Sequence, residues 1–179
     1  MWGPIIEKGW AKVKGSYMNA DGGISANALR FMTGAPSPGF LWKDFKDTTN
    51  AMDSVFKLLT ESVKKGHLIN IGTNGANDED VNQCNVATGH AYSIHDAFTI
   101  KDADNKEVKF VMVRNPWSTA GYNKEWGPQD TRWNDEKVAK QVIDKTSYDP
   151  RTSTKEKGIM FLPHTNLKKC FDDIAIAQV

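Results

Sequence analysis

The chain carries the strings Gly89-His90-Ala91-Tyr92-Ser93 and Arg114-Asn115-Pro116-Trp117, and the segment between them decides the fold. Residues 91–100 and 107–113 are rich in β-branched and aromatic side chains, which favour strands. The link between them, residues 101–106, is polar and contains turn-forming residues. These patterns predict one long β-hairpin with the two strings at its open end.

Folding this hairpin returns Asn115 to the neighbourhood of His90. Counting from the turn leaves an offset of about two residues, or roughly 7 Å along a strand. A β-bulge or an asymmetric loop can absorb such an offset. An imidazole beside a neutral amide is the pair that orients a general base for a thiolate nucleophile. The pair therefore lacks only a thiol.

The two cysteines of the chain do not supply that thiol. Cys84 lies in a polar loop, residues 72–88, and Cys170 lies in an expected short helix near the C-terminus. Neither opens a helix in a cationic setting, which is what lowers the pKa of a nucleophilic cysteine. We expect Cys84 to be a loop thiol and Cys170 a core residue. Two thiols without metal spacing and no signal peptide favour a reducing compartment, the cytoplasm.

Composition sets the class of protein. The 179 residues are 39% hydrophobic and 25% charged, as in an ordinary globular domain. The 23 basic and 22 acidic residues leave a net charge of +1, without the basic excess of a nucleic-acid or membrane-surface binder. No apolar run is long enough to span a bilayer. The four histidines are unclustered, so no transition-metal site is expected.

The remaining elements follow from hydrophobic spacing and from helix caps and breakers. Helices are predicted over residues 2–14 and 25–32, from Thr49 or Asn50 to Val63, over 134–142 and over 166–171; further strands are predicted over 67–72, 158–162 and 174–179. No regular secondary structure is predicted over residues 118–133 and 147–157. The order predicts an α+β domain with N-terminal helices and a mostly antiparallel sheet.

Four segments in order resemble one protein family. They are Trp2-x-x-x-Ile6-Glu7-Lys8-x-Trp10 with Gly15-Ser16-Tyr17, then Gly22-Gly23 with Thr33-Gly34, and then the two strings of the hairpin. In this order they resemble the calpain family of cysteine proteases, specifically the second, His/Asn-bearing half of the protease core. The resemblance implies that residues 1–179 form the β-rich, barrel-like half of a papain-like core. The nucleophilic cysteine would belong to an N-terminal half, absent here, which would be this chain's partner.

The same resemblance assigns roles to five residues. His90 would act as general base and acid, and Asn115 would orient its ring. Trp117 would cover the bond between them, on a wall that faces the missing half and stays exposed. Gly23 and Gly89 would lie along the substrate peptide, where the lack of Cβ allows close approach.

Calpains also carry calcium in this half, partly through an Asp-Gly-Glu segment before an aromatic strand. The matching segment here is Lys157-Gly158-Ile159, which offers no side-chain ligand. Glu125, Asp130 and Asp135 follow the Asn-Pro-Trp string, but calcium takes six to eight oxygen ligands. We therefore expect no metal site and no required cofactor in this segment, while calcium elsewhere in a longer protein stays open.

Two classes of function remain. The first is the His/Asn half of an intracellular cysteine endopeptidase that acts on protein substrates and is inactive without its cysteine. The alternative is a non-catalytic calpain-like module that binds other proteins. The retention of both His90 and Asn115 favours the first.

Overall fold

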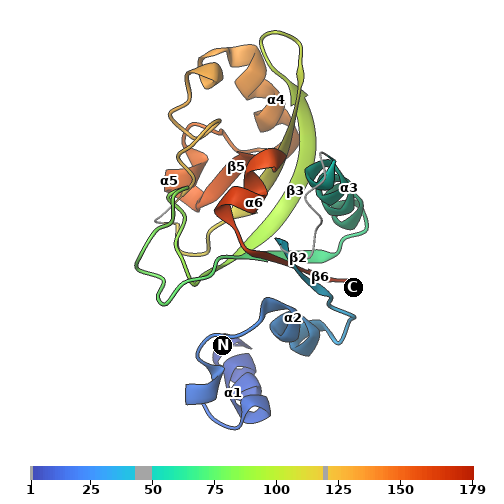
Figure 1. The fold of residues 1–179 in the computed structure, drawn as a ribbon, viewed down its shortest axis with the longest axis vertical. Coiled ribbons are helices and arrows are strands. Elements are labelled where there is room, and N and C mark those ends of the chain that lie inside the picture. Colours follow the sequence, from blue (N-terminus) through green and yellow to red (C-terminus); the bar gives the residue numbers. More distant parts are fainter. Residues whose placement is uncertain (1, 43–49, 119–120) are drawn as a thin grey trace.

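A computed structural model of the protein describes residues 2–42, 50–118 and 121–179. Its centre is one antiparallel sheet of six strands, with β1 and β5 at the edges (Figure 1). In spatial order the strands are β1 (Gly39–Leu41), β6 (Asp173–Ala177), β2 (Leu68–Gly72), β3 (Ala91–Lys101), β4 (Glu107–Arg114) and β5 (Ile159–Pro163). With helices on the N-terminal side, the α+β prediction is confirmed.

Helices precede and connect these strands. They are α1 (Trp2–Lys14), η1 (Met18–Ala20), α2 (Ser25–Thr33), α3 (Ala51–Lys64), η3 (Thr131–Asn134), α4 (Glu136–Thr146), α5 (Ser153–Lys157), η4 (His164–Asn166) and α6 (Leu167–Cys170). Figure 1 shows α1 and α2 at one end of the molecule and α4 at the other, with α3 beside the long strand β3. Local signals set the helix ends: Gly34 closes α2 in the left-handed conformation, and Asp135 caps α4.

The hairpin of β3 and β4 contains a β-bulge, one of the two features that could absorb the expected offset. Ser93 pairs with Arg114 and Ile94 with Val113, but the register then shifts so that Asp96 pairs with Met112. His95 is the extra residue. The shift places the residue after Arg114 level with Tyr92, on the face of the sheet that Tyr92 and His90 share.

Two hydrophobic clusters fill the core. The first joins α3 to the β2–β3 region through residues such as Leu59, Ile71 and Tyr92. The second lies beneath α4, where Trp133 packs against Phe110 of β4 with their ring centroids 5.7 Å apart. All five of these side chains are 0% exposed, so the hairpin is anchored from both ends.

The structure corrects the prediction of two free thiols. Cys84 and Cys170 form a disulfide, with Cα atoms 5.5 Å apart across 86 residues of sequence. Side-chain amides assist the approach: Asn82 Nδ2 donates to the carbonyl of Cys170 at 2.8 Å. Sequence spacing alone cannot show such a pairing. The cysteines therefore no longer support a reducing compartment, because disulfides are typical of oxidising ones.

Other differences are local. Strand β1 begins at Gly39, the last residue of the Pro/Gly cluster 35–39, for which the sequence predicts a loop. It forms because β6 offers an edge to pair with. The short helix α5 lies within the expected irregular stretch 147–157. Thr49, one of two predicted helix starts, lies outside the described residues, and α3 begins after Asn50. In the described part of the chain, no helix has the length and apolar character needed to cross a bilayer.

The disulfide makes a stability prediction. Replacing both Cys84 and Cys170 by Ser should lower the free energy of unfolding by about 2–5 kcal/mol, because a long loop of the unfolded chain is no longer closed. Urea denaturation of the oxidised chain and of the double variant measures the difference. Alkylation of the denatured, unreduced chain serves as the control and should add no label; labelling of both thiols would contradict the bond.

Candidate active site

His90 and Asn115 meet at the open end of the hairpin. His90 immediately precedes β3 and Asn115 immediately follows β4. The His90 Nε2 atom lies 3.1 Å from Asn115 Oδ1, a hydrogen-bond distance. Asn115 is 0% exposed, whereas His90 is half-buried and open on one side. The predicted proximity of the two side chains is confirmed.

The contacts of Asn115 fix the proton on the ring. Its Oδ1 also accepts the backbone N–H of Trp117 at 2.9 Å, so the atom that faces the imidazole is the oxygen. An amide oxygen only accepts, so Nε2 must donate to it. In the neutral ring this leaves Nδ1 unprotonated, with its lone pair available to take a proton.

Two aromatic rings hold the imidazole. The indole of Trp117 lies against it with centroids 4.2 Å apart, and the edge of Tyr92 meets it at 4.8 Å. Burial raises the pKa of Tyr92, whose hydroxyl donates to the carbonyl of Ala87 at 3.1 Å. Trp117 remains 45% exposed beside His90, as expected of a wall that is not interior core. The indole is thus in contact with the imidazole that bonds Asn115.

Thr73 is a positioning residue that the sequence did not reveal. Its backbone N–H donates to the carbonyl of His90 at 3.0 Å, and its Oγ1 accepts the His90 N–H at 3.1 Å. The same hydroxyl donates to the carbonyl of Ala87 at 2.7 Å. Thr73 is 7% exposed. These bonds fix the backbone from which the imidazole projects, and only the fold shows that β2 ends there.

Gly158 does the same for Asn115. The Asn115 N–H donates to the carbonyl of Gly158 at 2.8 Å. Gly158 has φ +69°, and a Cβ built on it would overlap the Asn115 carbonyl oxygen. Only glycine fits both conditions. The sequence pattern predicts that a strand starts at this residue, but it does not predict the contact with Asn115.

A groove of about 800 Å³ runs past His90 between α2 and the sheet. Gly23 and Gly89 both line it, together with the end of β2 and the start of β6. Gly23 is exposed, and no atom lies within 4 Å of its missing Cβ. The structure thus brings Gly23, Gly89 and His90 to one groove, whereas Trp117 lies outside its lining. Glycine backbones along a groove leave room for an extended peptide.

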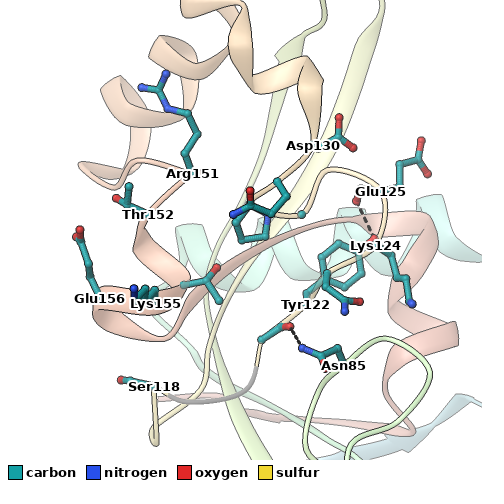
Figure 2. Close-up of a pocket in the computed structure, with 16 residues that line it drawn as sticks. Asn85, Ser118, Tyr122, Lys124, Glu125, Asp130, Arg151, Thr152, Lys155 and Glu156 are labelled. Carbon is teal, nitrogen blue, oxygen red and sulfur yellow. Dashed lines mark hydrogen bonds between the residues drawn. The ribbon is translucent and has the colours of Figure 1, made fainter.

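A second pocket, of about 790 Å³, lies apart from His90 (Figure 2). Figure 2 shows Glu125 and Asp130 on one side of it and Arg151 on the other. The Arg132 guanidinium lowers the pKa of Asp130 to about 2, so this carboxylate is ionised at neutral pH. Among the residues with described positions, no group of three or more His, Cys, Asp or Glu side chains could hold a metal ion.

Comparisons with known proteins agree with the family resemblance that the two strings of the hairpin carry. Residues 1–178 match the family described as Calpain family cysteine protease. Calpain-5 of Caenorhabditis elegans is 24% identical over 99% of this chain and 30% of its own length. The calpain-1 catalytic subunit of Rattus norvegicus is 26% identical over 74% of this chain and 18% of its own. The chain thus spans less than a third of these relatives.

Solved structures show a weaker likeness. The SERA5E protein of Plasmodium falciparum matches 79% of this chain and 44% of its own, at 16% identity and a TM-score of 0.39.

The Gly158 contact makes a prediction with a matched control. Gly158→Ala should lower the free energy of unfolding by about 1–3 kcal/mol more than Gly66→Ala. Both glycines have positive φ, but no atom lies within 4 Å of a Cβ on Gly66, so that control carries the backbone strain alone. Urea denaturation compares the two, and nitrogen-15 NMR should show the Asn115 backbone amide shifted only in Gly158→Ala. Equal losses would mean that Gly158 does not hold Asn115.

Proposed function

Since this chain belongs to the calpain family of cysteine proteases, we propose that it supplies the His and Asn of a Cys-His-Asn triad. The observation that carries the proposal is the 3.1 Å contact between His90 and Asn115. The thiol comes from a second, N-terminal half of the core. Residues 1–179 are then the His/Asn-bearing subdomain of a papain-like endopeptidase.

Each residue has a defined step. His90 Nδ1 takes the proton from the partner thiol, and the thiolate adds to the peptide carbonyl carbon. As the C–N bond breaks, the imidazolium returns that proton to the leaving amine. Water, deprotonated by His90, then hydrolyses the thioester and the proton goes back to sulfur. Asn115 Oδ1 accepts the hydrogen bond from His90 Nε2–H in each of these steps, and this bond holds the ring with Nδ1 toward the thiol.

The disulfide supports an external thiol. Both cysteines of the chain are consumed in the Cys84–Cys170 bond, and both are at most 1% exposed. A disulfide sulfur has no thiolate form to act as nucleophile. Catalysis by this chain therefore requires a cysteine from elsewhere.

The groove supports peptide substrates. Gly23 and Gly89 line it beside His90, so an extended chain can lie against backbone without meeting side chains. We therefore propose protein substrates, with Gly23 and Gly89 along the peptide. Trp117 shields the catalytic pair at the edge of this site.

The alternative is a non-catalytic module that binds proteins. The intact hydrogen bond disfavours it, because a binding surface has no need of an imidazole oriented by a buried amide and shielded by an indole. Cytoplasmic location stays a prediction, and the disulfide removes one of its grounds.

A paired experiment tests the proposal. The 179-residue chain alone should not hydrolyse peptides, whereas the same chain together with a Cys-bearing N-terminal half should. In the joined protein, His90→Ala should lower kcat/KM by more than about 10³-fold, since no base then activates the thiol. Asn115→Ala should cost less, about 10- to 100-fold, because it orients the ring without moving a proton.

His95→Ala is the matched control. His95 lies on the same hairpin but is exposed and meets Ser93 instead of Asn115. His95→Ala keeps the extra residue of the bulge and removes only the imidazole, so turnover should be unchanged. Turnover that survives His90→Ala would refute the assignment. Hydrolysis by the isolated chain would show that the thiol need not come from elsewhere.

A further inference from the structure

The loop between β4 and α4 is held by one guanidinium. Arg132 Nη1 contacts Glu125 Oε1 at 3.0 Å, and Arg132 Nη2 contacts Asp130 Oδ2 at 2.6 Å. Arg132 Nε also donates to Asp130 Oδ1 at 2.8 Å. The planar group lies over the Trp126 ring, 4.3 Å from its centroid. Arginine suits this setting because its fork matches a carboxylate and its face stacks on an aromatic ring.

Asp130 has no oxygen left for another ligand. Oδ1 accepts from the backbone N–H of Arg132 at 3.0 Å as well as from its Nε. Oδ2 accepts from the backbone N–H of Trp126 at 2.7 Å as well as from Arg132 Nη2. With two donors on each oxygen, the carboxylate is fully engaged without a metal.

The residues present do not fit the calcium ion that the family resemblance implies for this half. Of the three carboxylates expected near it, Glu125 and Asp130 are bound to Arg132, and Asp135 caps α4 by accepting from Lys137 N–H at 2.9 Å. The facing segment has Lys157 where calpains carry a carboxylate. Calcium requires several anionic oxygens. Both oxygens of Asp130 are engaged, one oxygen each of Glu125 and Asp135 is engaged, and residues 157–159 add no carboxylate.

Packing contacts in the core connect this loop with the candidate active site. Trp126 and Trp133 both pack against the ring of Phe110, at centroid distances of 5.3 and 5.7 Å, and against each other at 4.7 Å. Phe110 is a residue of β4, the strand that ends just before Asn115. A loop that releases Trp126 would therefore loosen the packing beneath this strand.

We propose that Arg132 is a built-in cation that does for this loop what a bound calcium ion would do, so that this half of the protease core keeps its shape independently of calcium. The guanidinium pairs with two carboxylates, offsets one of their two negative charges, and joins the two ends of the turn. Unlike an ion, it is covalently part of the loop and does not dissociate.

Thermal unfolding of the 179-residue chain tests the proposal. The Tm of the unsubstituted chain should be the same in EDTA and in about 5 mM calcium. Arg132→Gln should unfold at a lower Tm in EDTA, and calcium, but not magnesium at equal concentration, should raise that Tm by about 2–4 °C, because the two carboxylates are then free to bind it. Tryptophan fluorescence follows the same titration at Trp126 and Trp133.

The matched control is Arg151→Gln. Arg151 binds Asp149 and Glu136 in a similar cluster, at 2.7 and 2.6 Å, and lies outside the loop. Its loss should also lower Tm but should bring no response to calcium. In Arg132→Gln/Glu125→Gln the calcium response should disappear. Should Arg132→Gln fail to fold, Arg132→Lys, which keeps one charge, should fold and show a smaller calcium-dependent rise.

Three results would overturn the proposal. The first is a calcium-dependent rise in the Tm of the unsubstituted chain. The second is an Arg132→Gln variant that loses no stability. The third is an Arg132→Gln variant that is as insensitive to calcium as Arg151→Gln.

Discussion

The register of the β3–β4 hairpin is the constraint on which the site depends. A shift of one residue in a pairing moves every following side chain to the other face of a sheet. Without the bulge at His95, Asn115 would lie level with Ser93 and point away from His90. With it, Asn115 lies level with Tyr92, on the face of the imidazole. The single extra residue thus converts two distant strings of sequence into one hydrogen-bonded pair.

Everything around the pair holds that register at its open end, where a hairpin is weakest. Thr73, the residue after β2, bonds the backbone of His90, and Gly158, the residue before β5, bonds that of Asn115. Each catalytic candidate is therefore tied to the strand next to its own. The loop that precedes His90 is fixed in turn by the Cys84–Cys170 bond to α6. The imidazole is oriented before any thiol arrives, which lowers the cost of reaching a reactive geometry.

The sequence predicts the local elements of this fold but not the contacts between segments that are distant in the chain. The helices over 2–14 and 25–33 and the hairpin follow from hydrophobic spacing, Gly34 and turn chemistry, all of which act within a few residues. The sequence left open whether a bulge or the loop absorbs the offset of the hairpin, and the structure shows a bulge. The His90–Asn115 pair follows from counting along that hairpin. The disulfide, the Thr73 bonds and the Gly158 contact join segments that only the folded sheet brings together. No local pattern encodes them. Strand β1 was missed for the same reason, since its partner β6 lies at the other end of the chain.

The Cys84–Cys170 disulfide and the Arg132 cluster stabilise the packing at opposite ends of the hairpin. The disulfide secures the first hydrophobic cluster, where Tyr92 supports His90, and the Arg132 cluster borders the second, where Trp126 supports β4. Both cross-links join groups of the same chain, so neither requires an ion to bind from solution. A subdomain built in this way keeps the imidazole and the amide in register under conditions in which an ion-dependent loop would open. Under the proposed function such a subdomain still needs a thiol from outside, and the approach of a Cys-bearing half is then the step at which we propose that activity is controlled.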